Sequence, residues 1–190
     1  MVLKTYRNLS CYLLAEHWSE LLKQAPQQFG FIQGSFMSIE QKDFTNNLFS
    51  LLREFFISPS TGGAACLDQK TGLSDTLDTL SAAQASKRVN DAPSIAAHCE
   101  HLRFYNTLLM GGLQGKTFGK IDWKETWRKQ TVDEAEWQSL KNELNQQCRE
   151  LIALLESFGT WDDFRVGDPM AILAHTAYHL GAIRQLIRFV

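Results

Sequence analysis

The chain has 190 residues, of which 44% are hydrophobic and 21% are charged, and its formal net charge is -2. These values predict one soluble globular domain with a sizeable core, and the lack of a Lys/Arg-rich run argues against nucleic acid as a main partner. The four cysteines are scattered without a C-x-x-C pair, so we expect reduced thiols and a cytoplasmic location. Polar residues interrupt the apolar ones near the N-terminus, which predicts neither a signal peptide nor a membrane partner.

The first half of the chain predicts helices of unequal length. Apolar residues recur with helical spacing, and no segment alternates as a strand would, so the fold class is predicted to be all-α. A first helix is expected over residues 3–24, either as part of the main fold or as an appendage. The next helix is expected to start at Ser38, where Ser38 and Gln41 fit a capping box, and to end before 58–63. A short helix is expected within 73–85.

The second half predicts three long helices, over about 93–110, 131–158 and 168–189. A glycine pair follows the first of them at 111–112, and a loop or short-helix connection fills 113–130. The local signals that set these starts are Pro93 in a first turn, a capping box of Thr131 and Glu134, and an N-cap and first-turn pair of Asp168 and Pro169.

Four long amphipathic helices starting near residues 38, 93, 131 and 168 predict a four-helix bundle. The connection of about 20 residues between the second and third helices is long enough to cross over, so that these two helices can run parallel. We therefore divide the chain into an N-terminal helical extension, 1–37, and a bundle, 38–190. An extra N-terminal helix that packs on the bundle is an expectation for the first part.

Two of the five histidines, His175 and His179, lie four residues apart in the stretch AHTAYHLG. Four residues make about one helical turn, so both imidazoles lie on one face of the last helix. His98 occupies the corresponding inward stripe of the 93–110 helix, and His101 lies on a neighbouring row. The inward stripe of the last helix comprises Ile172, His175, His179, Ala182, Leu186 and Phe189, at spacings of three and four.

Buried neutral imidazoles need partners, because an unpaired buried polar group costs about 1–3 kcal/mol. A divalent metal ion would satisfy three imidazoles at once, since histidine is the commonest metal ligand in proteins. The alternative is a set of core histidines that bind backbone carbonyls or buried water. Both interpretations stand at this point, because the sequence does not show that the two helices are neighbours.

The strings SIAAHCEHLRFYN (94–106) and AHTAYHLGAIRQ (174–185), with IDWKETW (121–127) between them, resemble the DinB/YfiT-like superfamily. The resemblance covers about residues 38–190. It implies a four-helix bundle in an up-down-down-up arrangement with a three-histidine divalent metal site. Carried over residue by residue, it implies His98, His175 and His179 as the metal ligands. His101 competes with His98 for the first of these places.

The resemblance also implies a function, a metal-dependent enzyme such as a low-molecular-weight-thiol S-transferase or a hydrolase. The metal would be zinc, nickel, iron or manganese, the substrate a small molecule, and the protein a homodimer. The alternative is a non-catalytic stress or binding protein whose metal is structural or adventitious. Three tryptophans near the 113–130 connection, Trp123, Trp127 and Trp137, are interpreted as core or lid packing, with substrate walls as the alternative.

Overall fold

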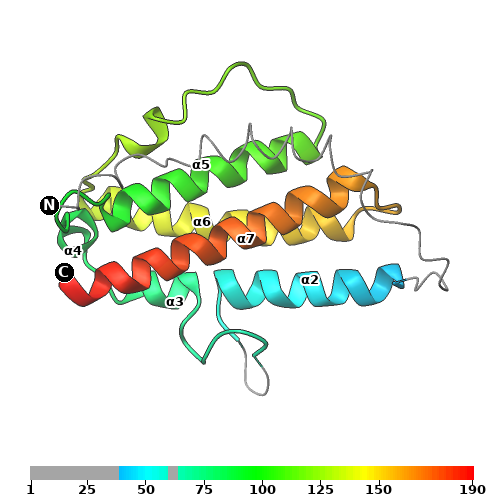
Figure 1. The fold of residues 1–190 in the computed structure, drawn as a ribbon, viewed down its shortest axis with the longest axis horizontal. Helices are drawn as coiled ribbons and strands as arrows, with labels where there is room; N and C mark the ends of the chain where they lie inside the picture. Colours follow the sequence, from blue (N-terminus) through cyan, green and yellow to red (C-terminus); the bar gives the residue numbers. More distant parts are fainter. Residues whose placement is uncertain (1–38, 60–63) are drawn as a thin grey trace, which may run out of the picture. The chain divides into compact units, whose positions relative to one another are not determined.

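Four long helices form a bundle in the computed structural model, which describes residues 39–59 and 64–190 (Figure 1). They are α2 (Gln41–Phe56), α5 (Ile95–Leu113), α6 (Glu134–Glu156) and α7 (Asp163–Leu186). In Figure 1, α2 and α7 run in one direction and α5 and α6 run in the other. The predicted all-α fold and its up-down-down-up arrangement are therefore confirmed.

Each long helix packs against two others. Helices α5 and α2 each contact both α6 and α7, which closes the bundle around one core. Because α5 and α6 are parallel, the chain between them must return along the length of α5. Figure 1 shows this connection arching beside α5, and it includes the short 3-10 helix η2 (Glu125–Trp127). The crossover expected from the length of the 113–130 connection is therefore present.

The core is built from apolar stripes at helical spacing. Leu48, Leu52 and Phe56 lie four residues apart on α2 and are all buried. The inward stripe of α6 is buried along its length: Trp137, Leu140, Leu144, Cys148, Leu151 and Leu155. Phe158 lies beyond the end of this helix and is half-buried.

Two short helices replace the single one that was expected within 73–85. They are α3 (Leu73–Asp78) and α4 (Ala82–Ser86). The break between them is a local capping effect, because the Ser81 side chain accepts the backbone N–H of Gln84 while the Gln84 side chain accepts the N–H of Ser81. This reciprocal capping box starts a new helix.

The start of α6 lies two residues after the predicted capping box. The prediction from Thr131 and Glu134 is wrong, because Asp133 is the N-cap residue and its carboxylate accepts the Glu136 N–H at 2.8 Å. The Glu136 carboxylate accepts the Asp133 N–H in return, at 3.0 Å. Val132 precedes this cap and packs against the core, an arrangement that favours the later register.

The start of α7 was also predicted wrongly, at Asp168 and Pro169. The helix begins five residues earlier, where the Asp162 side chain caps it by accepting the Arg165 N–H at 3.0 Å. Pro169 lies inside the helix and is buried. Proline has no N–H to donate to the carbonyl four residues before it, so Pro169 costs the helix one hydrogen bond without ending it.

The glycine pair after residue 110 does not end α5. Gly111 and Gly112 are both helical, and Gln114 is the C-cap residue. A Cβ atom on Gly111 would collide with the ring of Phe118, which folds back onto this turn of the helix. The glycine is therefore required for close approach of the connection to α5, rather than for a turn.

Three predictions depend on residues outside the described part of the chain. These are the helix over 3–24, the N-terminal extension 1–37 and the capping box at Ser38. In the described part, α2 begins after Glu40, whose side chain makes no capping hydrogen bond. Among the residues described, no helix is both long and apolar enough to cross a membrane.

Candidate metal centre

Four histidines meet where α5 packs against α7. His98 and His101 come from α5, and His175 and His179 come from α7. His98 and His101 are each 7% exposed, His179 is fully buried, and His175 is half-buried. The ring centroids of His175 and His179 lie 4.4 Å apart, and the His101 centroid lies 5.2 and 5.1 Å from them. The structure thus answers what the sequence left open, because the two histidine-bearing helices are neighbours.

Ring nitrogens in this cluster contact one another directly. Nε2 of His179 lies 3.1 Å from Nε2 of His175, and Nδ1 of His179 lies 2.9 Å from Nδ1 of His98. Each contact joins two nitrogens of neutral imidazoles, so one of the two must carry the proton and the other must accept it. His179 therefore lies at the centre of the cluster, with one ring nitrogen toward each neighbour.

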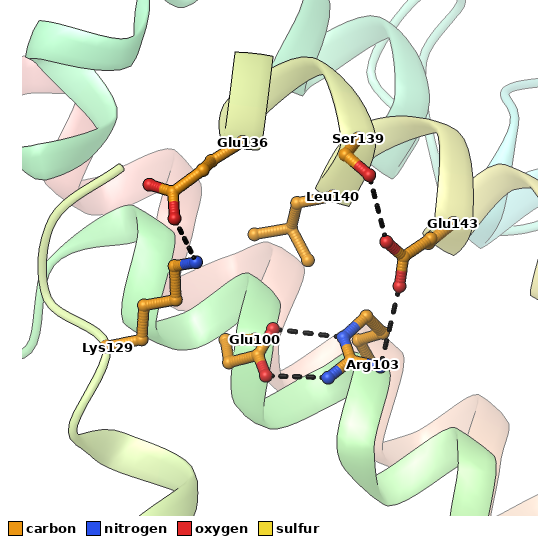
Figure 2. Close-up of a pocket in the computed structure, with 7 residues that line it drawn as sticks. All are labelled: Glu100, Arg103, Lys129, Glu136, Ser139, Leu140 and Glu143. Carbon is orange, nitrogen blue, oxygen red and sulfur yellow. Dashed lines mark hydrogen bonds and ion pairs between the residues drawn. The ribbon is translucent and has the colours of Figure 1, made fainter. Parts of the chain in front are cut away.

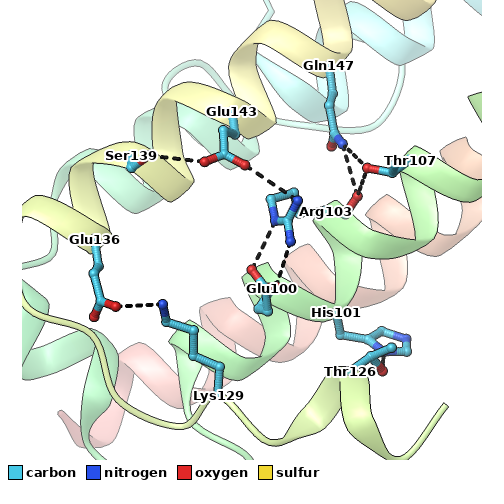
Figure 3. Close-up of polar contacts among 10 residues, drawn as sticks. All are labelled: Glu100, His101, Arg103, Thr107, Thr126, Lys129, Glu136, Ser139, Glu143 and Gln147. Atoms are coloured by element: carbon cyan, nitrogen blue, oxygen red, sulfur yellow. Dashed lines mark hydrogen bonds and ion pairs between the residues drawn. The ribbon is translucent and has the colours of Figure 1, made fainter. Parts of the chain in front are cut away.

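The tautomer of His101 is fixed by a residue outside the bundle helices. Nδ1 of His101 lies 2.6 Å from Oγ1 of Thr126, in η2 (Figure 3). The Thr126 hydroxyl donates its only proton to the backbone carbonyl of Trp123, at 2.7 Å. The hydroxyl must therefore accept the proton on Nδ1 of His101. This leaves Nε2 of His101 unprotonated, with a lone pair available to bind a metal ion.

Burial keeps the four imidazoles neutral. It lowers the pKa of His98, His101 and His175 to about 4, and that of His179 to about 2. The neighbouring imidazoles lower the pKa of His101 and His179 further. The neutral ring is the form that binds metal ions, so the cluster is prepared for a cation at neutral pH.

Three of the four histidines have the spacing of a metal site. One nitrogen each from His101, His175 and His179 lies within 4.8 Å of the other two. Two nitrogens that bind one zinc ion in tetrahedral geometry lie about 3.4 Å apart. The 3.1 Å between Nε2 of His175 and Nε2 of His179 is near that value. The donor set therefore fits a divalent metal ion.

The geometry favours His101 over His98 as the third member of this set. Both residues are buried on α5 and lie beside His179. His98, however, faces Nδ1 of His179, while Nε2 of His179 faces His175. The two nitrogens of an imidazole point in different directions. His98 and His175 therefore lie on different sides of the His179 ring. The competitor considered in the sequence analysis is the better-placed residue.

Aromatic rings enclose the cluster. Trp127 stacks on His101 with ring centroids 4.1 Å apart, and it meets His98 edge-on at 5.2 Å. Tyr105 stacks on His175 at 3.9 Å. Sequence reasoning had interpreted Trp127 as packing and had not singled out Thr126, although both belong to the string that resembles the superfamily. Trp137 lies elsewhere, fully buried in the core, where its indole N–H donates to the carbonyl of Leu80.

A second polar group lies on the face of α5 that meets α6 (Figure 2). It lines a pocket of about 260 Å³ and consists of ion pairs. Arg103 binds Glu100 through two nitrogens, at 2.9 and 2.6 Å, and lies 3.5 Å from Glu143. Lys129 binds Glu136 at 2.8 Å. Gln147 of α6 donates to the Arg103 carbonyl and the Thr107 hydroxyl (Figure 3).

A family model described as the DinB superfamily matches residues 69–183 of this chain. The match covers more than half of the 190 residues, and it includes all four histidines of the cluster and the connection that holds Thr126. Comparisons with curated proteins and with solved structures found no match. The family match, together with the bundle and its cluster of histidines, shows that the chain belongs to the DinB superfamily.

Proposed function

We propose that His101, His175 and His179 bind one divalent metal ion, and that the protein is a metal-dependent enzyme that transfers a low-molecular-weight thiol to an electrophilic substrate. The observation that carries the proposal is the grouping of one nitrogen each from His101, His175 and His179, together with the Thr126 hydrogen bond that leaves Nε2 of His101 unprotonated. The ligand set differs from the sequence-based one in a single place, where His101 replaces His98.

The donor set supports chemistry rather than a purely structural site. Structural zinc sites are usually closed by four protein ligands, whereas catalytic sites keep a position open for a small molecule. In the described part of the chain, the group that can hold an ion consists of three histidines without a carboxylate or a thiol. Imidazole ligands can bind any of the four expected metals, zinc, nickel, iron or manganese, so the ligands do not select one of them. A bound ion would supply Lewis acidity, which lowers the pKa of a coordinated thiol.

The protein's own buried thiols support the use of an external one. Burial raises the pKa of Cys99 well above its ordinary value and raises that of Cys148 to about 11. Neither side chain forms a thiolate at neutral pH, and thiolate is the reactive form. These two buried thiols are therefore not nucleophiles for a transfer, and the proposal assigns that role to a small-molecule thiol. Buried thiols of this kind also suit a reducing compartment, and a cytoplasmic location is part of the proposal.

A groove of a size that suits a small molecule shares one residue, Thr126, with the metal centre. A groove of about 490 Å³ lies between α5 and the segment that returns along it. Phe104, Leu108, Phe118 and Ile121 give it an apolar lining. Thr126 also lines the groove while its hydroxyl accepts the His101 proton. A small-molecule partner is therefore retained in the proposal, and a homodimer stays a prediction.

Elemental analysis tests the metal, on protein purified without a metal-affinity column. We expect about one divalent ion per chain, loss of that ion in His101→Ala and His175→Ala, and partial retention in His98→Ala. Steady-state assays of the metal-loaded protein against a panel of thiols and electrophiles test the activity. Turnover no higher than that of His175→Ala in every combination would refute the enzymatic part of the proposal.

The alternative is a non-catalytic bundle in which the metal joins two helices. The cluster favours this in one respect, because the ligands come from both α5 and α7 and two of the three are almost fully buried. Chelation separates the two functions. A structural metal predicts a large loss of melting temperature on chelation and no activity with any substrate, whereas a catalytic metal predicts lost turnover with a smaller change in melting temperature.

A further inference from the structure

His98 is buried against the metal centre but is not a member of the three-histidine set. It lies three residues before His101 on α5, with its side chain 7% exposed. Its Nδ1 is 2.9 Å from Nδ1 of His179, and its ring meets the ring of Trp127 at 88°. A buried histidine in such contact with a proposed ligand needs a role of its own.

That role depends on which of the two facing nitrogens, Nδ1 of His98 or Nδ1 of His179, carries the proton. If Nε2 of His179 binds a metal ion, that nitrogen carries no proton, so the neutral ring must carry its proton on Nδ1. At 2.9 Å, the only nitrogen placed to accept this proton among the described contacts is Nδ1 of His98. His98 is then the tautomer protonated at Nε2, and it acts as a hydrogen-bond acceptor.

We propose that His98 is a positioning residue that holds His179 in the metal-binding tautomer and orientation, without binding the metal itself. This inference rests on the proposed function, because it assigns a role relative to the proposed ligands. Histidine ligands generally donate their second N–H to a neighbouring acceptor, which fixes the ring and raises its basicity. His98 would accept the second N–H of His179 in the same way that Thr126 accepts the second N–H of His101.

Two substitutions of nearly equal shape separate positioning from packing. In His98→Asn, the side-chain oxygen can take the place of Nδ1 and accept the proton of His179. In His98→Leu, a methyl group stands there and accepts nothing. We expect affinity for Zn²⁺, measured by competition with a chelator, to fall about 10–100-fold in His98→Leu and to stay within a few-fold of wild type in His98→Asn. Equal melting temperatures of the two metal-free variants control for folding.

Nitrogen-15 NMR of the imidazoles in the zinc-loaded wild type gives a second readout. We expect a proton on Nδ1 of His179 and on Nε2 of His98, with Nδ1 of His98 unprotonated and free of metal. The Co²⁺-loaded variants should keep the wild-type visible absorption spectrum, because no ligand has been removed. If His98 had only a packing role, it would not fix these tautomers, and the His98→Asn and His98→Leu variants would bind Zn²⁺ equally well.

Three results would overturn the inference. Unchanged zinc affinity in His98→Leu would show that His179 needs no acceptor. Loss of metal from both His98 variants, with metal retained in His101→Ala, would make His98 a ligand. Failure of the wild-type protein to bind Zn²⁺ would overturn both the inference and the proposed function, and it is distinguished from the first result by the wild-type titration alone.

Discussion

Helix α5 carries polar groups on two faces, and the two faces solve the problem of burial differently. Toward α6, each charge has an opposite charge beside it, as in the set formed by Glu100, Arg103 and Glu143. Toward α7, four neutral imidazoles contact one another and a threonine. The charges on the face toward α6 are paired within the protein. On the face toward α7, the lone pair on Nε2 of His101 is not used by any described hydrogen bond.

The difference teaches how to distinguish a structural polar cluster from a functional one. Ion pairs between half-exposed side chains contribute little to stability, and the paired charges are not available to bind a ligand. Imidazoles whose pKa is lowered by burial keep their lone pairs at neutral pH, at a cost that a bound cation would offset. The predictions below test whether the two faces are as different as their contacts indicate.

The largest expected effect comes from the α7 face. His175→Ala removes a proposed ligand that is only half-buried, so we expect the affinity for Zn²⁺ to fall more than about 100-fold while the metal-free protein keeps its melting temperature. Isothermal titration calorimetry and thermal unfolding measure the two quantities. Gln185→Ala, an exposed position on the same helix, is the matched control and should change neither. Zinc binding at the wild-type level in His175→Ala would contradict the assignment.

Acidification should separate the faces next. Burial lowers the pKa of His101 and His175 to about 4 from an ordinary value of 6.5, so protons should compete with the metal only as the pH falls toward 4. We expect zinc affinity to be nearly level from about pH 8 to about pH 5 and to fall steeply below that. In the metal-free protein, the stability that depends on neutral histidines is present above pH 6.5 and is lost as the pH falls through about 4. Metal loss that begins near pH 6.5 would show that these imidazoles are ordinary exposed groups.

A smaller effect is expected at the hydrogen bond that fixes His101. Thr126→Val keeps the shape of the side chain and removes the acceptor for Nδ1–H, so zinc affinity should fall about 10–100-fold. Thr126→Ser keeps the hydroxyl and should bind like wild type. Chelator competition measures both variants. Equal affinities of the Val and Ser variants would indicate that the contact between His101 and Thr126 does not set the tautomer.

The smallest effect is expected on the α6 face. Glu143→Gln removes one carboxylate from Arg103, which keeps its two bonds to Glu100. Because the Glu143 side chain is 51% exposed, the free energy of unfolding should fall by less than about 1 kcal/mol. Urea unfolding measures this change, and zinc affinity should stay the same. A change in zinc affinity would reveal coupling between the faces that their contacts do not show.

Periodicity alone was enough to predict the long helices and the two histidine-bearing faces, because inward residues at spacings of three and four are a property of each helix by itself. The choice between His98 and His101 was different. These residues lie three positions apart, about 60° around the helix, so both can face α7. The distinction comes from Thr126 and from the proton on His179, and no helical pattern encodes either of them.

Proline and glycine misled the prediction where a nearby residue decided the outcome. Asp168 and Pro169 resemble a helix start, but Asp162 caps α7 earlier and the proline is buried within it. Gly111 resembles a stop signal, but it makes room for Phe118. In each case the residue type was interpreted for its backbone preference, while the outcome was decided by a residue six or seven positions away, Asp162 for α7 and Phe118 for Gly111.

Pro169 divides α7 into two parts that differ in their local stability against unfolding. Having no amide hydrogen, it leaves the carbonyl of Arg165 without its usual helical partner, so the turns before it are joined to the rest of the helix more weakly. Phe164, in those turns, is 73% exposed and adds little anchoring. Fraying of the first turns should therefore stop at the proline, and amide hydrogens from Ile172 onward should exchange with solvent far more slowly than those between Asp163 and Gly167.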